Sequence, residues 1–184
     1  MRPYEWSDYA REYSEKLCFA DEAVRLVSSG NIIRYVLGGE NHLDMALANR
    51  KNELKNVIVY TQILYDRYCI QKADSTGIHF TLVNAPLDLN QNGGNPDMNK
   101  KEIIEGFIVM AAVSPMDEFG YFWFVPDEPF KYQVEINKAQ YVIVEINELI
   151  PGNGNGGAEC IHISNVHCIV PGRNSPLIQK PYGV

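Results

Sequence analysis

The sequence lacks any stripe of basic residues. Lys and Arg number 16 against 23 Asp and Glu, so the formal net charge is −7. Proteins that bind nucleic acids neutralise phosphates with clustered Lys and Arg, and this composition therefore excludes nucleic acid as an expected partner. An acidic chain can still bind an anionic ligand locally, through helix N-termini and backbone N–H groups.

Long apolar runs and paired cysteines are also missing. No run approaches the ~18 apolar residues of a membrane-spanning helix, and residues 1–6 are polar and acidic, unlike a signal peptide. A chain of 184 residues can bury a core without disulfide bonds. We therefore expect a cytoplasmic protein with no membrane partner and with reduced thiols. The four scattered cysteines are Cys18, Cys69, Cys160 and Cys168.

Helix-like and strand-like segments alternate along the chain. The predicted helices cover residues 4–17, 20–29, 42–50 and 127–138. The predicted strands cover residues 32–37, 56–61, 107–113, 121–125 and 141–146, with short extended pieces at 160–164 and 166–170. Residues 62–83 stay open between helix and loop, with a strand as an option at 78–83. The alternation predicts an α/β domain whose mainly parallel sheet is flanked by helices.

Glycine, proline and asparagine predict where these elements end. Gly30 is expected to cap the helix at 20–29, and Asn41 to cap the helix that starts at His42. Surface or flexible connections are predicted where turn-forming residues cluster. These connections are residues 85–101, 151–157 and 171–184.

A glycine pair follows the strand at 32–37. Gly38 and Gly39 would let the backbone approach a ligand in a strand–turn–helix unit, although a tight turn with no ligand is an equal alternative. The pattern is neither a dinucleotide fingerprint nor a phosphate-binding loop with its lysine. The neighbouring Glu40 could position a substrate, but a glutamate stabilised by the start of a helix is the preferred interpretation.

The most distinctive stretch is the corner at residues 113–124, Val-Ser-Pro-Met-Asp-Glu-Phe-Gly-Tyr-Phe-Trp-Phe. An apolar run at 107–113 predicts a strand buried on both faces, and Pro115 ends it. We expect the Asp117 carboxylate to accept hydrogen bonds from nearby backbone N–H groups, and Gly120 to adopt a positive φ. The corner is thus predicted to be a structural device first and a ligand wall second.

Histidine and cysteine lie close together near residues 160–168, which suggests zinc. In an extended chain Cys160 and His162 share a face, whereas His167 and Cys168 point oppositely. No C-x-x-C pair is present to complete a site. We expect neither a metal nor a Cys–His nucleophile here, since no third orienting group is identifiable.

The corner motif Val-Ser-Pro-x-Asp-x-x-Gly-Tyr resembles the signature of the acetyl-CoA hydrolase/transferase family, which includes 4-hydroxybutyrate and butyrate:acetate CoA-transferases. The similarity covers most of residues 13–178, and further segments resemble the family's N-terminal domain in the same order. These segments are residues 19–23, 38–40, 46–48, 53–57, 139–147, 161–164 and 176–177. The resemblance implies a CoA-transferase N-terminal domain of the NagB/RpiA-like fold at residues 1–178, with 179–184 as a tail or the start of a linker.

The resemblance implies transfer of coenzyme A between short-chain carboxylates, or acyl-CoA hydrolysis. Coenzyme A is then a substrate, and no metal is needed. The family's nucleophile is a glutamate of a C-terminal domain that is not in this sequence, so the isolated chain is expected to be inactive. A C-terminal domain or subunit is the expected partner, in an oligomer. The implied substrate-binding residues are Gly38, Gly39, Glu40, Asn41, Ser114, Asp117 and Gly120.

A different class of function fits the same residues. The chain could be a non-catalytic relative with a regulatory role that binds an acyl-CoA or a protein partner. A neighbouring reading frame that encodes a glutamate-bearing second domain would favour the transferase, and its absence would favour the regulator.

Overall fold

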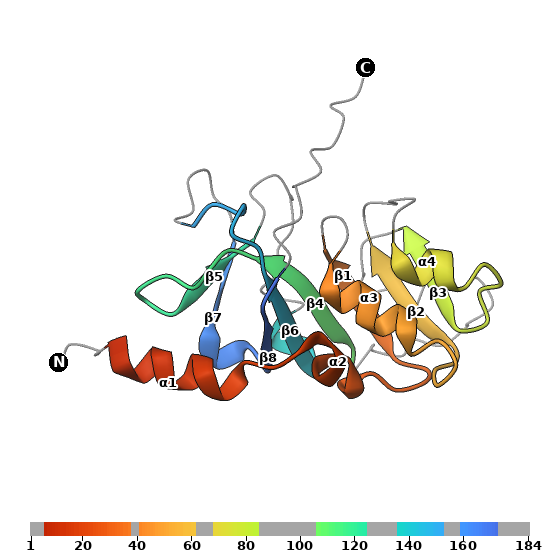
Figure 1. Cartoon of the computed structure of the whole chain (residues 1–184), viewed down its shortest axis with the longest axis horizontal. Coiled ribbons are helices and arrows are strands. Elements are labelled where there is room, and N and C mark those ends of the chain that lie inside the picture. The colour runs from red at the N-terminus through yellow and green to blue at the C-terminus, as the bar shows by residue number, and fades with distance from the viewer. Residues whose placement is uncertain are drawn as a thin grey trace, which may run out of the picture.

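A six-stranded parallel sheet forms the centre of the molecule. The computed structural model describes residues 6–37, 41–61, 68–84, 106–124, 136–152 and 159–172. Within them the sheet has the order β3-β2-β1-β4-β6-β8, and all its ladders are parallel (Figure 1). Its strands are β1 (Ile32–Val36), β2 (Val57–Thr61), β3 (Phe80–Asn84), β4 (Ile108–Val113), β6 (Tyr141–Ile146) and β8 (Cys168–Val170). The expected α/β fold with a mainly parallel sheet is confirmed.

The predicted strand at 121–125 does not join this sheet. It is β5 (Tyr121–Trp123), which pairs antiparallel with β7 (Cys160–His162) in a separate two-stranded sheet. Figure 1 shows this ribbon beside the strands of the large sheet. The corner after β4 therefore redirects the chain out of the main sheet.

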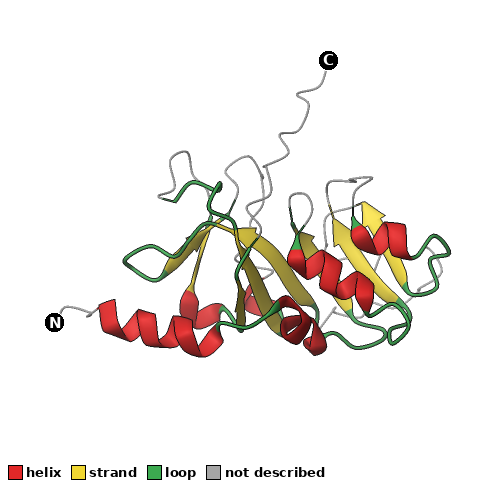
Figure 2. Cartoon of the chain, in the orientation of Figure 1, coloured by secondary structure: helices red, strands yellow, loops and turns green. Residues whose placement is uncertain are grey.

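The described helices are short. They are α1 (Trp6–Lys16), α2 (Ala20–Ala23), α3 (His42–Asn49) and α4 (Cys69–Ala73), with 3₁₀ turns η1 (Val24–Leu26) and η2 (Ile163–Asn165). In Figure 2, α2 and α3 lie in front of the large sheet. Residues 136–138 are helical, and the rest of the helix predicted at 127–138 lies outside the described residues. None of the described helices is long and apolar enough to cross a membrane.

Strand β4 shows how the two faces of the sheet are filled. Its side chains alternate between two apolar clusters, because successive residues of a strand point to opposite faces. Ile108 and Met110 join the cluster that includes α3, whereas Val109 and Val113 join the cluster that includes β5 and β7. All six residues of β4 are buried, so the prediction of a strand covered on both faces is confirmed.

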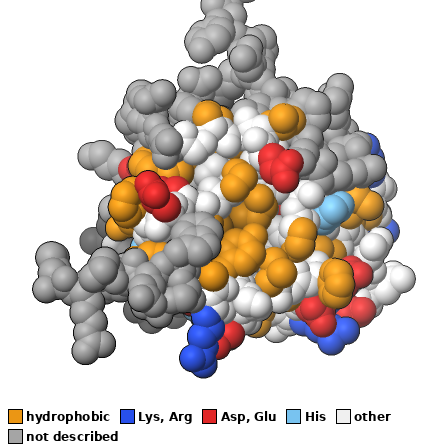
Figure 3. Space-filling view, turned by 60° about the vertical axis from the view of Figure 1, so that its left-hand side comes forward, with side chains coloured by type: hydrophobic (Ala, Val, Ile, Leu, Met, Phe, Trp, Pro, Cys, Tyr) orange, Lys and Arg blue, Asp and Glu red, His pale blue; other side chains and the backbone are white. Residues whose placement is uncertain are grey.

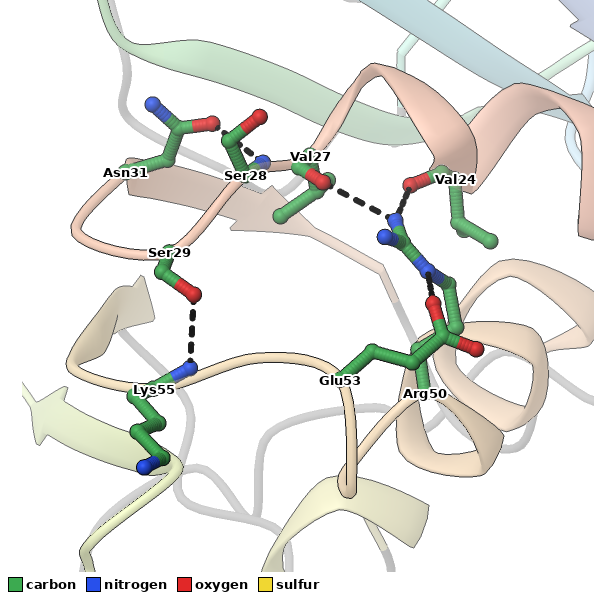
Figure 4. Close-up of polar contacts among 8 residues, drawn as sticks. All are labelled: Val24, Val27, Ser28, Ser29, Asn31, Arg50, Glu53 and Lys55. Carbon is green, nitrogen blue, oxygen red and sulfur yellow. Dashed lines mark hydrogen bonds and ion pairs between the residues drawn. The ribbon is translucent and has the colours of Figure 1, made fainter.

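The helix predicted at 20–29 is wrong in length. It ends as a 3₁₀ turn at Leu26, and Val27 is already extended with φ −84° and ψ 129°. Arg50, at the end of α3, donates from one guanidinium nitrogen to the carbonyl oxygens of Val24 and Val27 (Figure 4). These carbonyl oxygens thus accept hydrogen bonds from outside the helix. They therefore need no N–H donor from a further helical turn.

Gly30 consequently does not cap a helix. It lies in a turn with φ +82°, and its N–H donates to the carbonyl of Lys55 at 2.9 Å. The turn is closed by the Asn31 side chain, which accepts from the N–H of Ser28 at 2.7 Å (Figure 4). The Ser29 hydroxyl accepts from the Lys55 N–H at 3.0 Å. Gly30 therefore serves the start of β1 rather than the end of α2.

The structure describes residues 68–83 of the ambiguous region, whereas residues 62–67 lie outside the described residues. Residues 69–73 form α4 and residues 80–84 form β3, which confirms the strand option. The extended piece predicted at 160–164 ends at His162, because η2 begins at Ile163. The connection predicted at 85–101, residues 153–157 of the connection predicted at 151–157, and the chain beyond residue 172 lie outside the described residues. The boundary between a domain at 1–178 and a tail at 179–184 stays a prediction.

Candidate ligand site at the carboxyl edge of the sheet

The sheet changes direction between β1 and β4. Strands β2 and β3 extend it on one side of β1, and β4, β6 and β8 extend it on the other. Ligands of open parallel sheets bind outside the carboxyl ends of the strands at such a switch point. The stretches that leave β1 and β4, which carry all the implied substrate-binding residues, start from the two strands that flank this point.

Buried polar side chains gather at the same edge. Thr61 ends β2, Ser114 follows β4 and Asn147 follows β6, and each is at most 3% exposed. Asn41 and Glu145 are buried to the same degree. Sequence reasoning singled out Asn41 and Ser114 but missed the other three. A polar residue at the end of an apolar strand was the signal that could have found them.

Asn41 does not cap helix α3 as expected. It occupies the N-cap position with φ −121° and ψ 155°, but its side chain makes no capping hydrogen bond. The cap comes from β6: the two carboxylate oxygens of Glu145 accept from the N–H groups of His42 at 3.0 Å and Leu43 at 2.9 Å. Glu145 reaches α3 because it shares a strand face with Ile143, which packs in the α3 cluster.

Both ends of the segment 38–40 are fixed by long-range contacts, although Gly38, Gly39 and Glu40 themselves lie outside the described residues. Before it, the Tyr68 hydroxyl donates to the carbonyl of Leu37 at 3.0 Å and lies 3.3 Å from the Thr61 hydroxyl. After it, the Glu145 carboxylate accepts hydrogen bonds from the N–H groups of His42 and Leu43. The start and the end of this segment are thus held by contacts from different parts of the fold.

Ser114 is engaged inside the corner. Its hydroxyl donates to the carbonyl of Pro115 at 2.9 Å and accepts from the N–H of Trp123 at 3.0 Å. Its N–H also donates to the carbonyl of Trp123 at 2.9 Å. Ser114 therefore joins the end of β4 to the end of β5.

Asp117 organises the rest of the corner. Its Oδ1 accepts from the N–H groups of Phe119 and Tyr121, both at 2.9 Å, and its Oδ2 accepts from the indole of Trp123 at 3.1 Å. Gly120 has φ +81°, as predicted. An added Cβ there would lie 2.9 Å from Cδ1 of Tyr9 on α1. The structural account of this corner is confirmed, and any ligand contact by these residues stays a prediction.

A second buried carboxylate lies behind the edge. Asp44 of α3 is fully buried, and its burial raises the pKa to about 6. Hydrogen bonds from the N–H groups of Cys69 and Ile70 and from the Tyr35 hydroxyl act in the opposite direction. Burial, followed by the charge of Asp44, raises the pKa of Tyr35 well above its ordinary value. This carboxylate joins α3 to α4, and its raised pKa favours the protonated form more than in an exposed aspartate.

The histidines near residues 160–168 serve the fold. His162 Nδ1 lies 2.9 Å from the Ser164 hydroxyl, and its ring meets Tyr121 edge-on with centroids 4.9 Å apart. His167 Nδ1 accepts from the N–H of Val142 at 3.0 Å. Burial, with a smaller contribution from Lys16, lowers the pKa of His167. Within the described ranges, no group of three or more His, Cys, Asp or Glu residues is placed to hold a metal ion.

The corner also presents apolar surface. Phe119 is 64% exposed and Tyr121 is 37% exposed. Figure 3 turns forward the side of the molecule that carries α1, β5 and β7, and apolar side chains gather near the centre of the face it shows. Exposed aromatic side chains of this kind are typical of surfaces that contact another protein or domain.

Comparison with known proteins shows which proteins this chain resembles. No family model matches the sequence. The chain is 34% identical to the butyryl-CoA:acetate CoA-transferase of Anaerostipes caccae, over 93% of this chain and 42% of the relative. It is 30% identical to a probable butyrate:acetyl-CoA coenzyme A-transferase of Syntrophomonas wolfei, over 90% of this chain and 40% of that protein. The chain spans about two-fifths of the length of these curated relatives.

Solved structures share the fold. The 4-hydroxybutyrate CoA-transferase of Porphyromonas gingivalis matches with a TM-score of 0.71 at 21% identity, over 94% of this chain and 43% of that one. RipA of Yersinia pestis matches with a TM-score of 0.65 at 23% identity, over 96% of this chain and 46% of that one. These structures show the fold, and the curated relatives at 34% and 30% identity make this protein a partial CoA-transferase-like chain. Among such proteins, the curated relatives it resembles are named for exchange between butyryl-CoA or butyrate and acetate or acetyl-CoA.

Proposed function

We propose that this chain is the N-terminal half of a CoA-transferase or acyl-CoA hydrolase that moves coenzyme A between short-chain carboxylates. The observation that carries the proposal is its match, over nine-tenths of its own length, to about two-fifths of two named transferases. The glutamate nucleophile would come from a C-terminal domain or subunit. Coenzyme A takes part as the acyl-CoA substrate, and the proposal involves no metal.

The chemistry of such a transfer is covalent. The glutamate carboxylate attacks the thioester carbonyl and releases coenzyme A as its thiolate, which leaves an acyl–glutamyl anhydride. The thiolate then attacks the glutamyl carbonyl and releases the first carboxylate. The second carboxylate reverses these steps with its own acyl group. The part assigned to this chain is to bind and orient the acyl-CoA beside that glutamate.

The carboxyl edge of the sheet supports this assignment of roles. Gly38, Gly39, Glu40 and Asn41 would form one wall of the substrate site, next to β1. The corner of Ser114, Asp117 and Gly120 would form the other wall, next to β4. Since the Ser114 hydroxyl and the Asp117 carboxylate are committed to hydrogen bonds within the corner, they would act by keeping its shape.

The test is an assay of the purified chain with butyryl-CoA and acetate, alone and with the product of any reading frame that continues or neighbours its gene. We expect no turnover by the chain alone, because its proposed nucleophile lies elsewhere. We expect turnover once a glutamate-bearing second part is supplied. Turnover by the chain alone that is lost on mutating one of its own residues would overturn the division of labour proposed here.

The exposed aromatic corner supports a second candidate function, a non-catalytic relative that binds an acyl-CoA or a protein and regulates. Phe119 and Tyr121 would then contact a regulated partner rather than a catalytic domain. The transferase and a protein-binding regulator would both work in an assembly. We also propose a cytoplasmic location, which the absence of a disulfide among the four described cysteines supports. Sedimentation of the chain should show self-association, or binding to the second part. A clean monomer that binds no second part would count against the transferase and against a protein-binding regulator.

A further inference from the structure

The two edges of the ribbon formed by β5 and β7 differ. On the β5 side, the corner covers the edge. The N–H of Tyr121 donates to Asp117 Oδ1, and its carbonyl accepts from the N–H of Asp117, both at 2.9 Å. The N–H of Trp123 donates to the Ser114 hydroxyl at 3.0 Å, and its carbonyl accepts from the N–H of Ser114 at 2.9 Å. The backbone groups of Tyr121 and Trp123 are thus fully used by the corner.

The β7 side is open at His162. Hydrogen-bonded and non-hydrogen-bonded pairs alternate in an antiparallel ladder, so Phe122 and Ile161 form the bonded pair between the two strands. The backbone groups of Cys160 and His162 consequently point away from β5. Among the described residues, the N–H and the carbonyl oxygen of His162 have no hydrogen-bond partner. A strand edge of this kind is a template for another extended chain.

The outward face of the ribbon is rich in aromatic side chains, although an exposed sheet face is usually polar. Phe122 and Ile161 point into an apolar cluster, so their neighbours in β5 and β7 point outward. Tyr9 of α1 extends this face, since its ring centroid lies 5.5 Å from that of His162. A strand paired with β7 would place alternate side chains beside these rings. The outward residues are Tyr121, Trp123, Cys160 and His162.

The charge near this face is negative. Residues 113–124 and 159–165, which build the corner and the ribbon, contain three acidic residues and no Lys or Arg. Figure 3 shows carboxylates beside apolar side chains on this side of the molecule. After burial, the charges of nearby carboxylates raise the pKa of Cys160, so their field extends to the ribbon. The three acidic residues are Asp117, Glu118 and Glu159.

Aromatic rings beside carboxylates suit a cationic side chain. The guanidinium of arginine stacks on Tyr and Trp rings and pairs with carboxylates. Lys16 of α1, which reaches the end of the ribbon at the carbonyl of Ile163, is already paired with Glu12 at 2.7 Å. A second copy of this chain fits poorly, because its net charge is −7 and pairing would bring two acidic corners together.

We propose that the open edge of β7 binds an extended, arginine-bearing segment of a partner protein, which adds a third strand to the ribbon. The backbone of this segment bonds to the N–H and carbonyl of His162. Its arginines lie against Tyr121 and Trp123 and close to the carboxylates. This inference goes beyond the proposed function, because it concerns a protein segment and neither acyl-CoA nor a substrate carboxylate.

The first experiment uses a short blocked peptide that alternates arginine with valine, and a control peptide with glutamate in place of arginine. Both are titrated into the ¹⁵N-labelled wild-type chain. The arginine peptide should shift the amide signals of Cys160 and His162 and slow exchange at His162 about tenfold or more, as expected for one new hydrogen bond. The glutamate peptide should do neither. Equal binding of the two peptides, or no binding of the arginine peptide at about 1 mM, would overturn the proposal.

Backbone pairing is tested without altering the chain. Two further arginine peptides carry N-methyl groups, one on the arginine amides and the other on the valine amides. Alternate amides of a strand point to opposite edges, so only one of these peptides should lose binding. Both keep the full positive charge and therefore control for general attraction to an acidic protein. If both bind as tightly as the parent peptide, the proposed third strand is overturned.

Charge is tested with two exposed residues. Glu118→Lys lies in the corner, and Asp21→Lys, at the start of α2, makes the same change in net charge elsewhere. Glu118→Lys should weaken binding of the arginine peptide about tenfold at low salt, and Asp21→Lys should change it little. Equal effects would overturn the assignment of the arginines to this face.

The peptide-free chain decides the alternative occupant. We expect exchange at His162 to be fast and that at Ile161 to be slow, at every protein concentration. Slow exchange at His162 that becomes fast on dilution would show that a second copy occupies the edge, and it would overturn the proposal. None of these measurements involves acyl-CoA, so their failure leaves the proposed function standing, and its failure leaves them interpretable.

Discussion

At the carboxyl edge of the sheet, two turns have their backbone N–H groups bound by carboxylates from different parts of the chain. Both the corner after β4 and the start of α3 present backbone N–H groups that lack a partner in regular structure. In the corner, Asp117 accepts from N–H groups two and four residues further along the chain. At α3, Glu145 accepts from N–H groups more than a hundred residues earlier.

The difference shows what each carboxylate stabilises. Asp117 is only partly buried and holds one local reversal, which can form before the rest of the sheet. Glu145 is fully buried and holds together two elements that meet only when β1, β4 and β6 are side by side. Loss of the first should loosen a corner, whereas loss of the second should weaken the assembled sheet.

The largest expected effect is that of Glu145→Ala. Two buried N–H groups lose their acceptor and a space opens beside β6, so we expect the free energy of unfolding to fall by about 3 kcal/mol. Urea titration followed by circular dichroism measures it. A loss below about 1 kcal/mol would mean that water replaces the carboxylate and that the long-range cap matters little.

Gly120→Ala should have the next largest effect, about 2 kcal/mol. The substitution combines a positive φ with close contacts, because the new Cβ would lie 2.9 Å from Tyr9 and 3.0 Å from His162. The matched control is Gly30→Ala, with φ +82° and no atom within 4 Å of the added Cβ. It should cost about 1 kcal/mol, which is the part due to backbone strain. Equal losses in thermal or urea unfolding would show that α1 moves freely away from the corner.

Asp117→Ala should lower the free energy of unfolding by about 1–2 kcal/mol through the donors it leaves without a partner. Asp117→Asn retains an acceptor and should lose less. Both can be measured by urea titration alongside Glu145→Ala, so that the local and long-range caps are compared directly. If Asp117→Ala unfolds like the wild type but weakens acyl-CoA or partner binding, the corner is a functional surface first, and its structural role is secondary.

The smallest expected effect is a pH dependence at the far edge of the sheet. Because burial lowers the pKa of His167 in the folded protein, the folded chain binds fewer protons there than the unfolded chain. Stability from this group is therefore complete above the unfolded pKa of about 6.5 and is lost as the pH falls through it toward the folded value. Protonation also removes the acceptor for the N–H of Val142.

The matched variant for this prediction is His167→Gln, whose side-chain oxygen still accepts a hydrogen bond but does not titrate. The difference in stability between wild type and variant should move in favour of the wild type as the pH rises from about 5 to 7.5. Asp44 has the opposite sign, since its raised pKa of about 6 makes its contribution fade as the pH rises. Because both proteins contain Asp44, its contribution cancels in the stability difference between them. A stability difference that does not change with pH would show that His167 does not contribute to the pH dependence of stability.

The same division between local and long-range contacts decides what the sequence could predict. The burial of β4 was predicted from its own continuous apolar run, and the positive φ of Gly120 and the role of Asp117 depend on neighbours within a few residues; all three predictions are confirmed. The expected cap of α3 by Asn41 was wrong because the cap comes from β6. The helix expected at 20–29 was too long because Arg50 satisfies its last carbonyls.

Strand pairing was the other feature that could not be predicted from the sequence. Residues 121–125, which include the observed strand at 121–123, were identified as a strand from their aromatic composition, but composition does not say which partner a strand takes. Their antiparallel pairing with residues 160–162 removes them from the main sheet. For the site, the two segments that flank the switch point were identified from glycine, proline and the family resemblance. Thr61, Glu145 and Asn147 each lie at or near the end of an apolar strand, which is a signal in the sequence, but only the structure shows that these strand ends meet at one edge.

The attachment of the N-terminal helix bears on how the protein is made. Leu17, just after α1, forms a bridge with Ile169 of β8, and the N–H of Cys18 donates to the carbonyl of Ile169 at 3.0 Å. Lys16 reaches the carbonyl of Ile163 at 2.7 Å. Synthesis runs from the N-terminus, so α1 leaves the ribosome about 150 residues before its docking strand exists. In the folded protein Tyr9 and Tyr13 lie against His162 and Phe122, so both tyrosines lack these partners during synthesis of more than a hundred residues, and a chaperone can bind the helix in that time.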